Sequence, residues 1–170
     1  MAVQTFFRKL THKSVWLPDY VTSSVAAIPI QVLVDSGIRH MVLDIDDTLV
    51  PFGGNKLDAT YIHYLKQVKK AHITLTIGSN TRRDIGGIAQ SIGADVIPQP
   101  WWSYKPMKAF YKTILAQTAE PPEVTAMVGD RVINDVVAAN RAGLVTILTN
   151  PMGRRRGWLS RLYAKYLTNH

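Results

Sequence analysis

The sequence predicts an α/β fold of three layers, in which helices cover both faces of a mostly parallel five-stranded sheet. Short apolar runs alternate with longer segments of helical periodicity from residue 40 to residue 148. Such alternation is typical of a parallel sheet built from strand–helix–strand units. Several of the apolar runs are followed at once by polar or acidic residues, at the position where open α/β sheets bind their ligands.

The expected elements follow from these patterns. A helix is expected over residues 30–36 with Gly37 as its stop, and Asp58 is a suitable N-cap for a helix that ends near Ala71. Further helices are expected over about 82–92, from Pro106 to about 118, and over about 132–142. The five strands are expected at about residues 40–45, 73–77, 95–97, 124–128 and 145–148.

Length and composition fit one domain over residues 1–170, with its core at about 38–150. The chain has no cysteine, which excludes disulfides and thiol chemistry and favours a reducing compartment. No apolar run reaches the roughly 20 residues that cross a bilayer. Arg8, Lys9 and Lys13 interrupt the N-terminal segment, so a secretory signal is not expected. These features predict a cytoplasmic protein.

The net charge of +8 is concentrated at the two ends of the chain. Residues 1–21 contain three basic side chains and one acidic one, and residues 151–170 contain five basic side chains and no acidic one. The segment between them is nearly neutral. This asymmetry predicts that the termini meet an anionic surface, and it does not indicate a basic groove through the core.

Both ends also have amphipathic patterns. The apolar residues of segment 3–15 recur at helical spacing, away from the basic ones. Along residues 158–167 an aromatic-rich apolar face lies opposite basic side chains. A helix of this kind either lies on anionic lipid or packs on its own domain, and the sequence leaves both open.

Residues 41–52 are the stretch that first suggests chemistry. An apolar run leads into Asp44, Asp46 and Asp47 within four positions. In a strand Asp44 and Asp46 turn to the same side, and two carboxylates so close are unfavourable unless a cation or a shared proton relieves them. Mg²⁺ is the usual cation. In isolation the pattern is more often a strand end that runs into an acidic turn, so the rest of the chain must decide.

Other strand ends carry polar groups that would converge on the same edge of the sheet. Ser79 and Asn80 follow the second strand, Lys105 precedes a helix, and Asp130 and Asp135 follow the fourth strand. Each of them alone could be a cap, a turn residue or a surface residue. Together with the acid pair they predict a site for a phosphate group and a magnesium ion.

In these residues the sequence resembles the haloacid dehalogenase (HAD) superfamily. The four motifs of that family match at DIDDTL (44–49), Ser79, Lys105 and GDRVIND (129–135). A closer resemblance, to the YqeG-type subfamily of class IIIA phosphatases, extends over nearly the whole chain. Its further matches are LPDY (17–20), KPM (105–107), the rest of the stretch 128–143 and TILTNPM (146–152). The resemblance implies a Rossmann-like HAD fold.

The resemblance also implies roles for the motif residues. Asp44 would be the nucleophile that takes the phosphoryl group, and Asp46 the general acid and then base. The implied magnesium ligands are Asp44, Asp46 through its backbone carbonyl, Asp130 and Asp135. Phosphate binding is implied for Ser79, Asn80, Lys105 and Thr48, of which Thr48 orients the first motif. Asp47 has no implied role, because many relatives carry Gly or Asn there.

The motif spacing leaves no room for a cap domain. Between Asp44 and Ser79 lie 34 residues, and between Ser79 and Lys105 lie 25, and a loop, a helix and a strand fill each interval. A site without a cap is open and cannot enclose a small metabolite. Its specificity is therefore expected to come from a macromolecule or a membrane lipid headgroup that covers the opening.

These observations predict a Mg²⁺-dependent phosphomonoester hydrolase that acts through an aspartyl phosphate. The YqeG-type resemblance implies that it converts phosphatidylglycerophosphate to phosphatidylglycerol in phospholipid biosynthesis. The expected partners are an anionic lipid headgroup and the inner face of the membrane, which the basic termini would meet as those of a peripheral protein. No specific nucleic acid is expected, since no RNA-binding aromatic motif is present.

Other functions remain as alternatives. The domain could be a phosphatase for phosphoprotein, nucleic-acid or small-molecule phosphates. A non-catalytic anion-binding module is disfavoured by the intact pair Asp44 and Asp46, and a dehalogenase is disfavoured because Asp46 matches the phosphatase pattern. A receiver domain would carry its phosphoacceptor after the third strand, where Pro98-Gln99-Pro100 stands instead.

Overall fold

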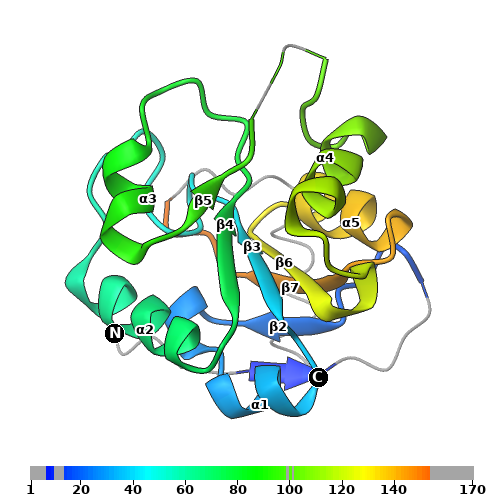
Figure 1. Cartoon of the computed structure of the whole chain (residues 1–170), viewed down its shortest axis with the longest axis horizontal. Coiled ribbons are helices and arrows are strands. Elements are labelled where there is room, and N and C mark those ends of the chain that lie inside the picture. The colour runs from blue at the N-terminus through cyan, green and yellow to red at the C-terminus, as the bar shows by residue number, and fades with distance from the viewer. Residues whose placement is uncertain (1–6, 10–13, 99, 101, 154–170) are drawn as a thin grey trace.

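The computed structural model describes residues 7–9, 14–98, 100 and 102–153. A central sheet lies between two groups of helices (Figure 1). The helices are α1 (Ile30–Asp35), α2 (Ala59–Lys70), α3 (Gly86–Ile92), α4 (Lys108–Thr118) and α5 (Ala138–Arg141). The three layers and the mostly parallel sheet confirm the predicted fold class.

Within the described residues the sheet has seven strands, two more than predicted. In spatial order they are β1 (Phe7–Lys9), β2 (Tyr20–Thr22), β7 (Val145–Thr149), β6 (Thr125–Gly129), β3 (His40–Leu43), β4 (Thr74–Ile77) and β5 (Asp95–Val96). All neighbours are parallel except β1 and β2. The predicted strands are β3 to β7, and β3 lies between β4 and β6.

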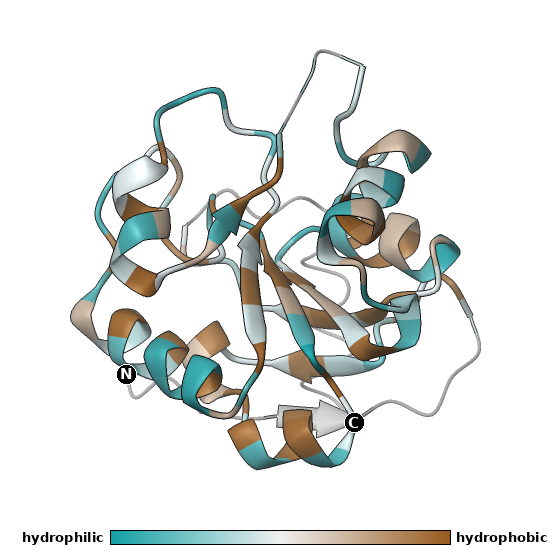
Figure 2. Ribbon diagram, viewed as in Figure 1, coloured by the Kyte–Doolittle hydropathy of each residue, from teal (hydrophilic) through white to brown (hydrophobic). Residues whose placement is uncertain are grey.

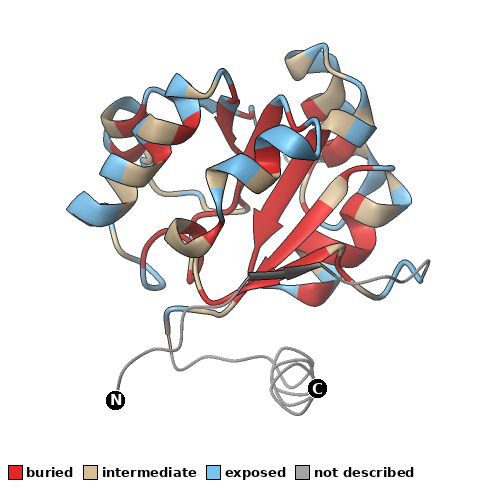
Figure 3. Ribbon diagram, turned by 90° about the horizontal axis from the view of Figure 1, so that it is seen from below, coloured by how far each residue is buried: buried red, intermediate tan, exposed pale blue. Residues whose placement is uncertain are grey.

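Successive side chains of the strands point to opposite helical layers, as the pleat of a strand requires. Met41 and Leu43 of β3 belong to the core that contains α1, α2 and α3, whereas Val42 between them packs with α4 and α5. Strands β2, β3, β4, β6 and β7 are largely buried, the short edge strand β5 is exposed, and the outer sides of the helices carry exposed residues (Figure 3). Along α2 and α3 apolar and polar residues alternate accordingly (Figure 2).

The N-terminal segment forms a strand where an amphipathic helix was expected. Phe7–Lys9 is β1 and pairs antiparallel with β2, so the predicted helix over residues 3–15 is wrong at these positions. Pairing with the sheet satisfies the backbone groups of this segment and overrides its helical periodicity. The predicted helix over 158–167, together with the rest of the basic tail from residue 154 onward, lies outside the described residues.

Polar contacts with residues near the other end of the chain hold the segment that leads into β2. The Asp19 carboxylate accepts hydrogen bonds from the backbone N and the hydroxyl of Thr146, at 2.8 and 3.1 Å. The amide of Asn140 donates to the carbonyls of Val15 and Leu17, at 2.9 and 2.8 Å. The residues around the LPDY stretch therefore join the N-terminal segment to β7 and α5.

Several predicted helix ends are confirmed. The Asp58 carboxylate accepts a hydrogen bond from the backbone N of Thr60 at 2.8 Å and caps α2. α1 ends at Asp35, two residues before Gly37, whose φ of +71° lies in the left-handed region that favours glycine. α3 begins only at Gly86, four residues later than expected, and leaves Arg82 and Arg83 in a loop.

Two other helices begin differently from the prediction. α4 starts at Lys108 instead of Pro106, because the residues before it belong to a loop that the polar edge of the sheet holds. The predicted helix over 132–142 begins as a π-helical turn, Val132–Val137, and continues as α5. Such turns are frequent at functional sites, and this one contains Asp135.

The described residues contain no cap domain. The segment between β3 and β4 holds α2, and the segment between β4 and α4 holds α3 and β5. Of the helices that the structure describes, none has the length and hydropathy needed to cross a membrane.

Candidate active site

The topology of the sheet brings the predicted motif residues together. Asp44 directly follows β3, Ser79 follows β4 by two residues, and Asp130 directly follows β6. Since β4 and β6 flank β3 in parallel, the three strands end at the same edge. The backbone N of Asp44 still bonds the carbonyl of Val128 at 2.9 Å, so the sheet fixes the start of the first motif.

Lys105 is the cation at the centre of the site. Its Nζ lies 2.6 Å from Asp44 Oδ1 and 2.6 Å from Asp135 Oδ1, and only 2% of its side chain is exposed. Burial alone would lower the pKa of Lys105, but the carboxylates of Asp135 and Asp44 outweigh it and raise that pKa above its usual value. The lysine is therefore protonated when a substrate arrives.

Asn80 positions Lys105 through two reciprocal hydrogen bonds. Its amide nitrogen donates to the Lys105 carbonyl at 2.8 Å, and its amide oxygen accepts from the Lys105 backbone N at 2.8 Å. Both functional atoms of the Asn80 side chain are therefore bonded to the loop before α4. These bonds give Asn80 a positioning role, and because it also lines the pocket, its phosphate-binding role stays a prediction.

Three carboxylates form the candidate metal centre. Asp44, Asp130 and Asp135 are buried, and each offers an oxygen within 4.8 Å of the others. Burial, then Asp135 and Asp44, raise the pKa of Asp130 to about 7. Burial raises the pKa of Asp135 to about 6, although Lys105 opposes the shift. An excess of buried negative charge and an all-oxygen donor set suit a hard divalent cation.

Gly129 and the π-helical turn allow Asp135 to reach this cluster. A Cβ at position 129 would lie 2.3 Å from Asp135 Cγ, so only glycine fits there. The backbone N of Arg131 donates to Asp135 Oδ2 at 3.0 Å. From α4, the Tyr111 hydroxyl donates to the carbonyl of Asn134 and ties the turn to that helix. These contacts hold Asp135 against the strand end.

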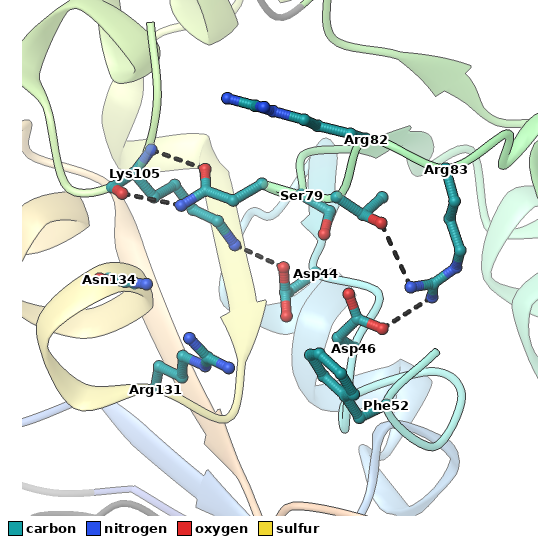
Figure 4. Close-up of a pocket in the computed structure, with 11 residues that line it drawn as sticks. Asp44, Asp46, Phe52, Ser79, Arg82, Arg83, Lys105, Arg131 and Asn134 are labelled. Carbon is teal, nitrogen blue, oxygen red and sulfur yellow. Dashed lines mark hydrogen bonds and ion pairs between the residues drawn. The ribbon is translucent and has the colours of Figure 1, made fainter. Parts of the chain in front are cut away.

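The carboxylate of Asp46 lies apart from the acidic cluster. Its Oδ1 forms an ion pair with Arg83 at 2.7 Å and accepts a hydrogen bond from the backbone N of Gly53 at 3.0 Å. Asp46 lines the same pocket as Asp44, at its opening toward Arg83 (Figure 4). A carboxyl group that stands beside the nucleophile and outside the metal cluster is available for proton transfer.

Asp47 and Thr48 form hydrogen bonds that join the first motif to other parts of the site. Asp47 has a φ of +61°, its Oδ1 accepts from the backbone N of Phe52 at 3.1 Å, and its carbonyl accepts from the backbone N of Met152 at 2.8 Å. The segment after β7 is therefore tied to the catalytic edge. Thr48 is not among the residues that line the pocket, and its hydroxyl donates to Asp130 at 3.4 Å, which joins the first motif to a candidate metal ligand. Its phosphate-binding role stays a prediction.

These residues surround an open pocket of about 330 Å³. Its lining residues are Asp44, Asp46, Phe52, Ser79, Asn80, Thr81, Arg82, Arg83, Lys105, Arg131 and Asn134 (Figure 4). The sequence prediction missed the pocket's three arginines and Phe52. Arg131 lies inside the fourth motif and Arg82-Arg83 closely follows Ser79, so basic residues adjacent to the motifs were the signal that could have identified them.

Comparisons with known proteins agree with this geometry. The family described as HAD-hydrolase-like matches residues 104–164. The protein named "Probable phosphatase YqeG" from Bacillus subtilis is 26% identical over 150 residues, which are 88% of this chain and 86% of that protein. The 150 aligned residues are more than the predicted core at about 38–150 contains, so the similarity extends beyond that core.

Solved structures share the fold. The 2-haloacid dehalogenase of Pseudomonas syringae matches with a TM-score of 0.52 and 14% identity, covering 78% of this chain and 100% of that one. The protein YfnB of Bacillus subtilis, whose structure was solved with magnesium bound, matches with a TM-score of 0.50 and 15% identity, covering 75% of this chain and 98% of that one. These likenesses show that the chain has the fold of these proteins. The family match, the YqeG similarity and the four motifs at one sheet edge make the chain similar to hydrolases of the haloacid dehalogenase superfamily.

Proposed function

We propose that the protein is a Mg²⁺-dependent phosphomonoesterase that acts on phosphatidylglycerophosphate at the membrane surface. HAD-family phosphatase activity is supported by the family match and by the similarity to YqeG. The observation that carries the proposal is the position of Asp44. Its carboxylate ends the central strand, lies 2.6 Å from the Lys105 ammonium and borders a pocket that Asp46 and Ser79 also line.

Asp44 provides the nucleophile. An oxygen of its carboxylate attacks the phosphorus atom, the bond from phosphorus to the alcohol oxygen breaks, and an aspartyl phosphate forms. Lys105 and Ser79 donate hydrogen bonds to the phosphoryl oxygens, where negative charge increases in the transition state. Because Asn80 holds the Lys105 backbone from both sides, little reorganisation of the lysine is needed.

Asp46 moves the protons of both half-reactions. Its carboxyl group protonates the departing alkoxide and then takes a proton from the water that attacks the aspartyl phosphate. This water releases inorganic phosphate and regenerates Asp44. The ion pair with Arg83 and the bond from Gly53 hold Asp46 at the pocket. The proton transfer requires that the contact with Arg83 opens when the substrate binds.

Asp44, Asp130 and Asp135 would hold the magnesium ion. The fit rests on three buried carboxylates with oxygens within 4.8 Å of one another. When bound, the ion neutralises charge between the carboxylates and the phosphoryl group. Thr48 and Arg131 support this set, Thr48 by its bond to Asp130 and Arg131 by its backbone bond to Asp135.

The lipid substrate is supported by the openness of the site and by charge. The pocket lies at the open edge of the sheet, and no described segment forms a cap over it. The five basic residues of segment 151–170 follow Pro151 and Met152, and Met152 is bonded to Asp47 beside the pocket. Met152 therefore lies at the catalytic edge, where a membrane that carries the substrate would approach, and the basic residues follow it in the sequence.

The direct test is the release of inorganic phosphate from phosphatidylglycerophosphate in mixed micelles, with Mg²⁺ and then with EDTA. We expect turnover with Mg²⁺ and loss of turnover with EDTA or with Asp44→Asn, a nearly isosteric change that removes the nucleophile. Ready turnover of a phosphopeptide or a 3′-phosphorylated oligonucleotide, without turnover of the lipid, would contradict the substrate assignment.

Membrane association needs a separate test. The full chain is expected to sediment with vesicles that contain phosphatidylglycerol and to stay in solution with neutral vesicles, because its excess charge is basic. A chain without residues 154–170 is expected to lose most of this binding. Unchanged sedimentation of the shortened chain would show that the basic tail is not the membrane contact.

A further inference from the structure

Four cationic side chains line the pocket, and the charges of two of them have no role in the proposed reaction. Lys105 is paired with Asp44 and Asp135, and Arg83 is paired with Asp46. The other two are Arg82 and Arg131, whose residues are exposed. In the part of the chain that the structure describes, neither guanidinium forms an ion pair with a carboxylate within 4.0 Å.

The positions of the two arginines follow from the topology of the sheet. Arg82 belongs to the loop after β4, and Arg131 to the loop after β6. Because β4 and β6 flank β3, the two side chains come from opposite sides of Asp44. In the close-up Arg82 lies beyond Ser79 on one side of the pocket and Arg131 lies on the other (Figure 4). They border the opening outside the buried cluster.

Their neighbours leave both guanidinium groups accessible to a ligand. The Arg82 guanidinium carbon lies 6.0 Å from the centre of the Tyr104 ring, which supports the side chain on one face. The charge of Arg131 acts on Asp130 and lowers its pKa against the stronger effect of burial, but the two form no close pair. Guanidinium groups stay charged at any physiological pH and fit the paired oxygens of a phosphate.

We propose that Arg82 and Arg131 form a second anion subsite, which binds the phosphodiester of the lipid headgroup while Asp44 attacks the terminal phosphomonoester. The assignment rests on the proposed function and deepens it, since it names the group by which this site selects its substrate. A phosphodiester carries one negative charge and two free oxygens, which the guanidinium groups can bind. An open site without a cap thereby gains selectivity from charge.

The test compares two water-soluble substrates in the full chain with Mg²⁺. Glycerol 3-phosphate carries the monoester alone, and glycerophosphoglycerophosphate, the deacylated headgroup, carries the monoester and the diester. Hydrogen bonds between ions typically change binding about tenfold each. We therefore expect kcat/KM of the unaltered protein to be about 100-fold higher for the headgroup than for glycerol 3-phosphate.

The variants Arg82→Gln and Arg131→Gln are each expected to reduce this ratio about tenfold, and the double variant to abolish it. Arg141→Gln, which removes the same charge from the last turn of α5, is the matched control and keeps the ratio. Arg82 and Arg131 are both exposed, so the variants are expected to fold. Thermal unfolding of each variant checks this expectation.

Three results would overturn the subsite. The first is an equal kcat/KM for both substrates in the unaltered protein. The second is a preference for the headgroup that survives in the double variant. The third is a loss of this preference in Arg141→Gln as large as in the pocket variants. If a 3′-phosphorylated dinucleotide, which also carries a monoester and a diester, is preferred over the headgroup and loses this preference in the double variant, the lipid headgroup is the wrong occupant.

A binding measurement separates the subsite from the proposed reaction. Calorimetry with the Asp44→Asn protein measures the affinity for the headgroup without turnover, and the added arginine substitutions are expected to weaken it about 100-fold. If the Asp44→Asn protein binds the headgroup and the arginine substitutions weaken this binding, but the unaltered protein does not turn the headgroup over, the phosphatase assignment alone is contradicted. Unchanged affinity after the substitutions would contradict the subsite alone.

Discussion

Two ion pairs at opposite ends of β3 have similar lengths and very different surroundings. At the carboxyl end, Lys105 lies 2.6 Å from Asp44 and from Asp135, and at most 7% of any of these side chains is exposed. At the amino end, Arg39 lies 2.8 Å from Glu120, with 57% and 30% of the two side chains exposed. Distance alone therefore does not distinguish a functional ion pair from a surface one.

The difference lies in desolvation. An exposed ion pair contributes little to the free energy of unfolding, because water and salt screen the attraction between its charges and both charges keep most of their hydration. Buried charges lose their hydration, and they remain ionised only where partners compensate for that loss. At the carboxyl end the compensation is incomplete, because Lys105 pairs with both Asp44 and Asp135 and the pKa of the neighbouring Asp130 is raised to about 7. The cluster is thus suited to binding further positive charge.

Removal of the buried cation is expected to have the largest effect. Lys105→Met keeps the length of the side chain and leaves Asp44 and Asp135 without their shared partner. We expect the free energy of unfolding of the metal-free protein to fall by about 3–5 kcal/mol, the range typical of a broken buried pair. Phosphatase activity is expected to fall about 100- to 1000-fold, as for the loss of one transition-state donor.

Urea unfolding in EDTA and phosphate release with Mg²⁺ measure the two quantities. Arg39→Met is the matched control, since it removes a cation from the other end of the same strand. Equal losses of stability in the two variants would contradict the distinction between the buried and the exposed pair.

The second effect is the response of the buried cluster to pH and metal. An aspartate of the unfolded chain has a pKa near 4, whereas those of Asp130 and Asp135 in the folded protein are raised to about 7 and about 6. Between pH 4 and 7 the folded state therefore binds more protons than the unfolded state. As pH rises through this range, these two groups lower the free energy of unfolding, by a few kcal/mol at most.

Mg²⁺ is expected to reverse this loss, because it stabilises the ionised carboxylates. The rise in melting temperature on addition of Mg²⁺ should be larger at pH 7.5 than at pH 5. Asp130→Asn should weaken both the pH dependence in EDTA and the response to Mg²⁺. A metal-free protein whose stability rises from pH 5 to pH 7.5 would show that the cluster does not carry the expected buried charge.

A third effect compares two glycines. A Cβ at Gly129 would overlap the Asp135 carboxyl group at 2.3 Å, whereas one at Gly87 in α3 would meet no atom within 4 Å. Gly129→Ala is expected to destabilise the protein by about 1–3 kcal/mol through overpacking, and to reduce activity because Asp135 must move. Gly87→Ala is expected to raise stability by up to about 1 kcal/mol. Thermal unfolding and phosphate release distinguish the two, and equal shifts would contradict the close approach.

The sequence alone could predict the parts of the site that depend on strand order. Asp44, Ser79 and Asp130 each follow a strand, and parallel strands end at one edge, so periodicity and spacing suffice to bring them together. Lys105 was found through the motif pattern of the family. The arginine loop after β4 was missed, because its conformation depends on the contact of Arg83 with Asp46, which no periodicity encodes.

Short edge elements were beyond prediction for a related reason. β1 and β2 have three residues each, too few to show a period. The strand geometry of β2 comes from pairing with β7, more than 100 positions away, and β1 in turn pairs with β2. The role of Asp47 likewise depends on a bond to Met152. Long-range contacts of this kind are specified by the assembled fold, whereas the local pattern of residues 3–15 favours a helix.

The exposed pair is expected to give the smallest effect. Arg39→Met should change the free energy of unfolding by less than about 1 kcal/mol, because a pair with this exposure is screened by solvent. A double-mutant cycle with Glu120→Gln isolates the interaction, and 1 M NaCl should remove most of it. Activity should not change, since Arg39 lies at the end of β3 opposite the pocket. A coupling energy above 2 kcal/mol would mean that the amino end of β3 excludes water as well. The two ends of β3 would then differ in the number of their acidic groups instead of in the burial of those groups.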